Sequence, residues 1–352
     1  MRRRRICVIT PGYADTGLPA TVDLVSGRAA AADVQVVALR YPPAGPPFRF
    51  RGATVHALGG GASAGPLRRT LMLARGVVRV VRLHGEHRFD RLWALWADEA
   101  GAVAVVAGRL IGRPVVVSVL GGELVALPDI GYGTARSHGG RWTVALALRW
   151  ADHVTVGSKP MWDAVARRVP PDRLRLMPLR VEPQVFFASG APKPGGPPTV
   201  LFVGSLEPVK DPVTMLRAFS LLASTTADVR LEVVGEGSMR PGLERLAQRL
   251  GIGRRVTFLG HLRRESLPDR YRAATVLCVS SRHEAQGMVA VEAAACGLPV
   301  VGTRVGALVD LGEAALTVPV GDHRALAGAL ARVVDDHRAR AGELGEPAVH
   351  VG

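Results

Sequence analysis

The chain has 352 residues with a formal net charge of +15, and hydrophobic residues make up 48% of it against 21% charged residues. A length above roughly 250 to 300 residues predicts two domains, and this composition excludes a disordered or fibrous protein. The positive charge is almost wholly arginine, which indicates either a solvated arginine-rich surface or attraction to anionic lipid or a phosphorylated substrate.

The chain begins with a basic cluster, residues 1–5, followed by an apolar stretch that ends at Pro11. That stretch is too short for a signal peptide, and arginines interrupt the most apolar region, 100–122, so we expect no membrane span. The cysteines lie in or beside apolar runs without metal-ligand spacing, which predicts buried, reduced thiols at Cys7, Cys278 and Cys296. We therefore expect a cytoplasmic protein, on the inner face of the plasma membrane if it binds lipid.

The first half of the chain alternates short runs of Val, Ile and Leu with helical patterns. Continuous apolar strands of this kind predict a parallel sheet that is covered on both faces. A Gly- and Pro-rich stretch, 42–66, predicts a long surface loop interrupted by one short strand. The predicted strands are residues 5–10, 34–39, 54–57, 91–95, 114–119 and 153–156.

A basic amphipathic helix is predicted over residues 66–83. Its arginines follow one another at spacings of seven, four and three, so one helical face carries Arg68, Arg75, Arg79 and Arg82. Such a face is either simply solvated or able to lie on anionic lipid. A peripheral membrane contact is therefore one of two interpretations of this helix.

The second half repeats the rhythm of strands and helices. Its predicted strands are residues 199–203, 229–234, 255–259, 275–279 and 299–302. The segment 188–198, ASGAPKPGGPP, tolerates neither helix nor strand and is predicted to be a linker. We expect an α/β protein with two Rossmann-like, doubly wound domains at 1–187 and 199–340, and a tail at 341–352.

Two glutamates, Glu284 and Glu292, flank a turn and a helix predicted from about 287 to 296. Eight positions of ideal helix span about 12 Å, more than the roughly 5 to 9.5 Å that separates glycosidase carboxylates. The pair therefore suits two parts of one extended ligand better than acid and base at one bond. Two solvated glutamates are the alternative for an isolated pair of this spacing.

The helix start after the strand 275–279 lies at the carboxyl edge of the second sheet, where open α/β sheets bind ligands. Backbone N–H groups near Gly287, Met288 and Val289 would point out of the helix toward an anion. A diphosphate group fits that position.

Residues 200–311 resemble the donor-binding domain of the retaining glycosyltransferases of family 4, which have the GT-B fold, with two such domains facing across a cleft. The matching stretches are LFVGSLEPVKDPVTMLRAF, ADVRLEVVGEGSMRPGLERLAQRLGI, VTFLGHL and the glutamate block with AACGLPVVGT. Weaker similarity covers the first half, in FDRLWALWADEAG, ADHVTVGSKPMWDAV and LRLMPLRVEPQVF. The resemblance implies that Glu284 contacts the transferred sugar, Glu292 holds the ribose hydroxyls and Lys210 binds the diphosphate.

The resemblance also adds substrate-binding candidates and shows departures from the family pattern. Ser205 stands where family members commonly have an arginine, so Arg263 or Arg264 would have to supply a second diphosphate cation. In LGGELV, Leu120 and Glu123 replace the usual histidine and aspartate. The remaining candidates are Gly17, near the diphosphate, His283, beside Glu284, and Leu262, at the end of VTFLGHL.

The resemblance implies retaining, metal-independent transfer of a hexose-type sugar, with no cofactor. The donor would be UDP- or GDP-linked, and the acceptor a glycan, a lipid-linked compound or a small molecule. A catalytically silent GT-B protein that binds a nucleotide-sugar or a partner is the main alternative. A nucleotide-sugar epimerase lacks a recognisable acid/base set, and nucleic-acid binding lacks aromatic platforms or a known module.

Family members usually continue past the helix predicted at about 323–338 with another that crosses back to the first domain. The chain ends soon after this helix, so we expect looser closure between the two domains.

Overall fold

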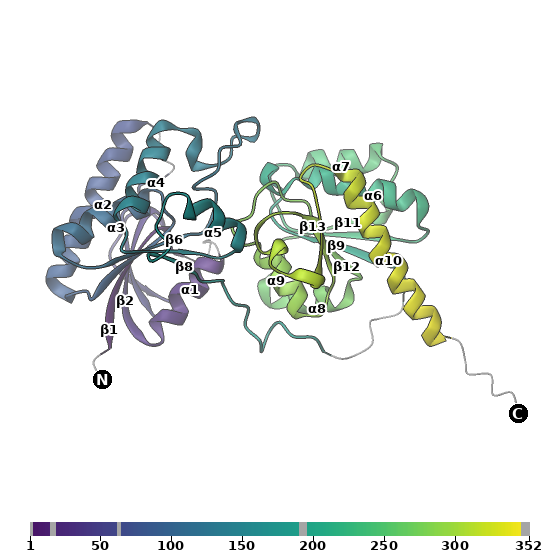
Figure 1. Cartoon of the computed structure of the whole chain (residues 1–352), viewed down its shortest axis with the longest axis horizontal. Helices are drawn as coiled ribbons and strands as arrows, with labels where there is room; N and C mark the ends of the chain where they lie inside the picture. Colours follow the sequence, from purple (N-terminus) through teal and green to yellow (C-terminus); the bar gives the residue numbers. More distant parts are fainter. Residues whose placement is uncertain (1–2, 15–18, 62–64, 190–195, 346–352) are drawn as a thin grey trace, which may run out of the picture. The chain divides into compact units, whose positions relative to one another are not determined.

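The computed structural model describes residues 3–14, 19–61, 65–189 and 196–345. The chain divides into two compact units, Met1–Leu179 and Arg180–Gly352 (Figure 1). Most of the predicted linker, at 190–195, and the end of the predicted tail, 346–352, lie outside the described residues. Phe186 already packs in the core of the second unit, and the predicted domain limits at 187 and 199 stay predictions.

The first unit is built on an eight-stranded sheet in the order β3-β4-β2-β1-β5-β6-β7-β8. Neighbouring strands are parallel except β3 and β4, which form an antiparallel pair. The strands are β1 (Arg4–Gly12), β2 (Ala32–Tyr41), β3 (Phe48–Phe50), β4 (Ala53–Ala57), β5 (Arg91–Leu95), β6 (Val115–Val119), β7 (His153–Val156) and β8 (Leu174–Leu176).

Helices connect these strands. They are α1 (Pro19–Ala29), α2 (Pro66–His87), α3 (Glu99–Ile111), α4 (His138–Trp150) and α5 (Lys159–Ala166). Helix α2 packs against α3, and α3 packs against α4. Side-chain caps fix three of these helix starts, because Asp98 accepts from the Ala100 N–H, Ser137 from the Gly140 N–H and Ser158 from the Met161 N–H. These starts lie at the carboxyl edge of the sheet, where ligands bind in open α/β folds.

The second unit has a six-stranded, wholly parallel sheet in the order β11-β10-β9-β12-β13-β14. Chain order reverses between β9 and β12, the doubly wound arrangement whose reversal point forms a ligand-binding crevice. The strands are β9 (Thr199–Val203), β10 (Arg230–Val234), β11 (Val256–Gly260), β12 (Val276–Val279), β13 (Val300–Thr303) and β14 (Ala315–Val318). The helices are α6 (Pro212–Thr225), α7 (Arg240–Arg249), α8 (Leu267–Ala273), α9 (Met288–Ala295) and α10 (His323–Gly345).

Two hydrophobic clusters cover the faces of this second sheet. One contains residues of α6, α7 and α10, including Phe219 and Leu330. The other contains residues of α8 and α9, including Tyr271 and Ala293. Because both faces are buried, the strands appear in the sequence as continuous apolar runs. Each strand predicted from the sequence is therefore present, and its first and last residues differ from the predicted ones by at most two positions.

The predicted α/β class and the two doubly wound sheets are confirmed. The strands β3, β8 and β14 were not predicted. Burial of the three cysteines is also confirmed, and each is unpaired; burial raises the pKa of the Cys278 thiol to about 12. Over the part of the chain that the structure describes, no helix combines the length and apolarity that crossing a membrane requires.

Candidate functional site

The loop between β12 and α9 carries the first predicted glutamate. Glu284 precedes α9, as predicted, and Gly287 caps the helix start with a φ of 84°, a conformation that glycine adopts without strain. Helix α9 begins at Met288, so the N–H groups of Met288 and Val289 belong to its first turn, as expected. Their contact with a diphosphate stays a prediction.

Glu284 and Lys210 form an ion pair through Oε1 and Nζ, and the Ser281 hydroxyl donates to the same oxygen at 2.7 Å. Lys210 ends a 3-10 helix, Pro208–Lys210, that follows β9. The Ser280 hydroxyl donates to the Lys210 carbonyl at 2.8 Å, and the Arg282 N–H donates to the Val209 carbonyl at 2.8 Å. The loops after β9 and β12 are therefore tied together at the point where chain order reverses.

Glu292 lies inside α9 and is only 4% exposed. Its Oε1 accepts from the Arg264 Nε at 3.1 Å and lies 3.1 Å from Arg264 Nη2, and its Oε2 accepts from the Tyr271 hydroxyl at 3.1 Å. Burial, followed by the charge of Glu292, raises the pKa of Tyr271, so the hydroxyl stays protonated and remains a donor. The Arg264 guanidinium also stacks 5.2 Å over the Phe186 ring.

Arg264 thus pairs with Glu292 in this structure, and its role as a second diphosphate cation stays a prediction. Sequence reasoning did not identify Tyr271. Its position in the apolar pattern of α8 carries no signal beyond burial, and only the fold brings its hydroxyl to Glu292.

The loops after β9 and β10 meet backbone to backbone beside the Lys210 loop. A side chain at Gly235 would collide with the Gly204 carbonyl, and one at Gly237 with the backbone of Leu206. The Leu206 N–H donates to the Glu236 carbonyl at 2.9 Å. This close approach explains why glycines stand at positions 235 and 237.

The other predicted residues of this unit lie around the same edge. Ser205 is exposed in the loop after β9, His283 is half-buried beside Glu284, and Leu262 is half-buried after β11 and packs against the α8–α9 side of the core. Their roles as substrate-binding residues stay predictions. No group of three or more His, Cys, Asp or Glu side chains within 3–14, 19–61, 65–189 and 196–345 is arranged to hold a metal ion.

In the first unit, Glu123 is 1% exposed and accepts from three backbone N–H groups. These belong to Gly121 at 2.7 Å, Leu120 at 3.0 Å and Ala97 at 3.2 Å. Burial raises the pKa of its carboxyl, which the backbone hydrogen bonds oppose. Glu123 therefore ties the loop after β6 to the loop after β5, and substrate contact by it stays a prediction. Gly17 lies outside the described residues.

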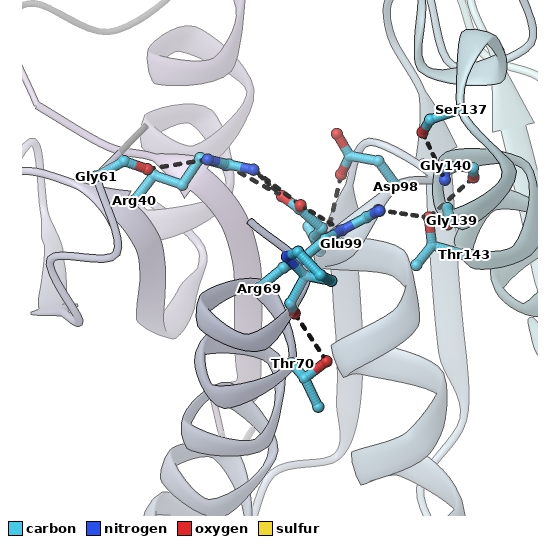
Figure 2. Close-up of polar contacts among 12 residues, drawn as sticks. Arg40, Gly61, Arg69, Thr70, Asp98, Glu99, Ser137, Gly139, Gly140 and Thr143 are labelled. Atoms are coloured by element: carbon cyan, nitrogen blue, oxygen red, sulfur yellow. Dashed lines mark hydrogen bonds and ion pairs between the residues drawn. The ribbon is translucent and has the colours of Figure 1, made fainter. Parts of the chain in front are cut away.

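A polar cluster that the sequence did not reveal joins three helix starts of the first unit (Figure 2). Buried Glu99, the first residue of α3, accepts from the Arg40 Nη2 at 2.7 Å and pairs with the Arg69 Nε at 2.9 Å. The Arg69 Nη2 donates to the Thr143 hydroxyl at 3.0 Å. The residues come from β2, α2, α3 and α4, so only the tertiary fold assembles them.

Asp98 caps α3 next to this cluster. Burial, then the charges of Glu123 and Glu99, raise the pKa of Asp98 to about 7, against smaller opposing effects of the Ala100 N–H and Arg40. The carboxyl edge of the first sheet thus carries two arginines, both paired with Glu99, beside a carboxyl group whose pKa is raised.

Comparison with known proteins agrees with this geometry. Residues 186–346 match the family of glycosyl transferases group 1, and residues 19–180 match the glycosyl transferase 4-like domain. A D-inositol 3-phosphate glycosyltransferase of Acidothermus cellulolyticus is 34% identical over 261 residues, covering 67% of this chain and 57% of that protein. The enzyme of that name from Mycolicibacterium gilvum is 42% identical over 132 residues, covering 37% of this chain and 28% of that protein. The matches therefore span only part of the length of these relatives.

Solved structures share the fold across nearly the whole chain. Sucrose-phosphate synthase of Thermosynechococcus elongatus superposes with a TM-score of 0.75 at 23% identity, covering 95% of this chain and 90% of that one. Anabaena HepE in complex with UDP-glucose superposes with a TM-score of 0.70 at 20% identity, covering 95% of this chain and 90% of that one. At these identities the likeness shows the fold alone.

Proposed function

Because the chain belongs to the glycosyl transferases group 1 family and has the GT-B fold, we propose that it transfers a sugar from a nucleotide-sugar donor to an acceptor. The observation that carries the proposal is the pairing of Lys210 with Glu284, on the loops after β9 and β12, eight residues before Glu292 in α9. Complexes of solved neighbours with UDP-glucose and UDP-2-fluoro glucose support a nucleotide-sugar as the donor.

Each residue has a distinct role in this proposal. Glu284 accepts hydrogen bonds from hydroxyls of the transferred sugar, and Glu292 accepts from the ribose hydroxyls. Lys210 and the first N–H groups of α9 stabilise the negative charge that develops on the diphosphate as the glycosidic bond breaks. Transfer proceeds with retention and without a metal ion, and the leaving phosphate helps to deprotonate the acceptor hydroxyl.

The acceptor belongs to the classes of glycans, lipid-linked compounds and small molecules. The names of the relatives, D-inositol 3-phosphate glycosyltransferase, favour an acceptor that carries a phosphate group. The partly exposed guanidinium groups of Arg40 and Arg69 support this choice, because arginine pairs with phosphate through two parallel hydrogen bonds.

The rival function is a catalytically silent GT-B protein. It is favoured by Ser205, which stands where a second cation for the diphosphate is expected. Donor turnover separates the two. We expect a UDP- or GDP-linked sugar to raise the apparent melting temperature and then to release its nucleoside diphosphate. A donor that binds and stays intact supports the silent protein.

A peripheral contact with anionic membrane is a further part of the proposal. On α2, a row of exposed apolar side chains runs beside the predicted arginine row and includes Leu67, 72% exposed, and Leu71, 55% exposed. The row continues with Val78 and Val81, and the four arginines Arg68, Arg75, Arg79 and Arg82 are all exposed. An apolar row beside a cationic row is typical of helices that lie in the membrane interface.

Sedimentation with lipid vesicles tests this contact. We expect the chain to bind vesicles containing phosphatidylglycerol more tightly than neutral phosphatidylcholine vesicles, because each arginine near an anionic surface contributes about 1 kcal/mol. Replacing both Leu67 and Leu71 by serine should weaken binding by at least about tenfold through lost apolar burial. Leu221→Ser, at an exposed position of α6, is the matched control; equal binding by all three proteins contradicts the contact.

A further inference from the structure

A cavity of about 650 Å³ lies in the second unit, away from the candidate donor site. Its lining residues come just before or at the start of strands: Pro198 precedes β9, Arg230 starts β10 and Arg255 precedes β11. Lys210, in contrast, follows the end of β9. Because these strands are parallel, the cavity opens at the amino edge of the sheet, opposite the edge that carries Lys210 and Glu284.

Four arginines line this cavity: Arg230, Arg254, Arg255 and Arg338. Asp228 is the one carboxylate among its lining residues. The ring of side chains therefore has an excess of three positive charges before any charge on His337 is counted. Like charges gathered around a concave surface raise the local potential and attract anions.

Two of these guanidinium groups are held in place by the end of α6. Arg255 Nη1 donates to the carbonyls of Ala223 at 2.8 Å and Thr226 at 3.3 Å, and Arg338 Nη2 donates to the carbonyl of Ala227 at 2.5 Å. These bonds satisfy carbonyls that a helix end leaves open. They explain the presence of Arg255 and Arg338 structurally, and they also fix the direction of the remaining N–H groups.

The other two arginines have no such explanation. Among the residues that the structure describes, none accepts a hydrogen bond from the side chain of Arg230 or Arg254 or forms an ion pair with it, and both are exposed at the rim. The guanidinium N–H groups of these two arginines are thus available to a ligand that enters the cavity. A ligand held there gains contacts with two exposed arginines and two fixed ones without rearranging the fold.

We propose that this cavity binds a compact ligand with two or more phosphate groups, distinct from the nucleotide-sugar. Guanidinium groups bind phosphate oxygens in pairs of parallel hydrogen bonds, and the volume exceeds what a single phosphate fills. The described lining residues include no Phe, Tyr or Trp on which a nucleobase would stack. The chemistry therefore favours a polyphosphate or a sugar bisphosphate over a nucleotide.

Calorimetric titration of the full chain with inorganic pyrophosphate tests the proposal. The titration is made with saturating UDP present, and again in a Lys210→Ala variant, so that the candidate donor site contributes nothing. We expect pyrophosphate to bind under both conditions, and to bind at least about tenfold more weakly when Arg230 and Arg254 are both replaced by serine, because hydrogen bonds to charged groups are lost.

The matched control replaces Arg245 and Arg249 by serine, since these exposed arginines of α7 lie outside the cavity and carry the same charge. This variant should bind pyrophosphate within about twofold of the unchanged chain. Three results overturn the proposal: no binding of pyrophosphate, binding that disappears in the Lys210→Ala variant, or equal weakening in the two double variants. The last result would assign the attraction to net charge alone.

Discussion

Replacing Lys210 by alanine should lower kcat by roughly 100- to 1,000-fold, the usual effect of removing one preorganised group that stabilises developing charge. The reason lies in its position, because its Nζ is held by Glu284 at the reversal point of the second sheet. A cation there acts mainly on the leaving diphosphate, so kcat should fall more than donor affinity. Steady-state kinetics with the donor that binds measures this split.

The controls for Lys210 separate charge from structure. Lys210→Arg keeps the charge and should retain most of the activity, whereas Arg249→Ala removes an exposed arginine of α7 and should leave kcat unchanged. The melting temperature of each variant shows whether the unpaired Glu284 destabilises the fold. A Lys210→Ala protein that folds normally and keeps full kcat would remove Lys210 from the mechanism.

Glu292→Gln should weaken UDP binding by roughly 10- to 100-fold, because hydrogen bonds to a charged acceptor contribute about 1.5 to 3 kcal/mol. The carboxylate is buried and held on both oxygens, by Arg264 and by Tyr271. A fixed acceptor loses little entropy when it binds ribose. The loss of UDP affinity in Glu292→Gln should depend on the ribose hydroxyls, so the same substitution should change the affinity for 2′,3′-dideoxy-UDP much less.

Tyr271→Phe extends the same test to the residue that positions Glu292. It removes one hydroxyl and keeps the ring, which packs 6.2 Å from Phe186. We expect a smaller loss of UDP affinity, roughly two- to tenfold, that again vanishes with the dideoxy nucleotide. A merely structural role would weaken both nucleotides equally.

The control for this pair of variants is Glu313→Gln, at an exposed position outside the site. If Glu292→Gln discriminates between UDP and its dideoxy analogue as strongly as the unchanged chain, Glu292 does not contact ribose.

Much of the fold could be predicted from sequence because the second sheet is parallel and buried on both faces and the first is parallel except at its β3–β4 edge, which makes each predicted strand a largely continuous apolar run. The strands that were not predicted, β3, β8 and β14, are short, lie at the edges of their sheets and bury few side chains. A short edge strand therefore lacks the continuous apolar run by which β7, β12 and β13, with four residues each, were predicted. The pairing of these edge strands depends on neighbouring strands that only the folded chain supplies.

The candidate site divides in the same way. The residues of the glutamate block and Lys210 were predicted, because a short contiguous motif and its place after a strand carry the signal. The contacts that hold them were not: Tyr271 and Arg264 reach Glu292 from another helix and turn. The cluster of Arg40, Arg69 and Glu99 lies on three separate elements, and nothing in their local sequence indicates that they meet.

The most direct test of nucleotide-sugar transfer is to follow the donor itself by NMR. The chain is incubated with a UDP- or GDP-linked sugar that raises its melting temperature and with a phosphorylated polyol as acceptor. We predict release of the nucleoside diphosphate and a new glycoside with the anomeric configuration of the donor, both absent in Lys210→Ala. A donor that binds and remains intact with every acceptor class would contradict the account and identify a binding protein instead.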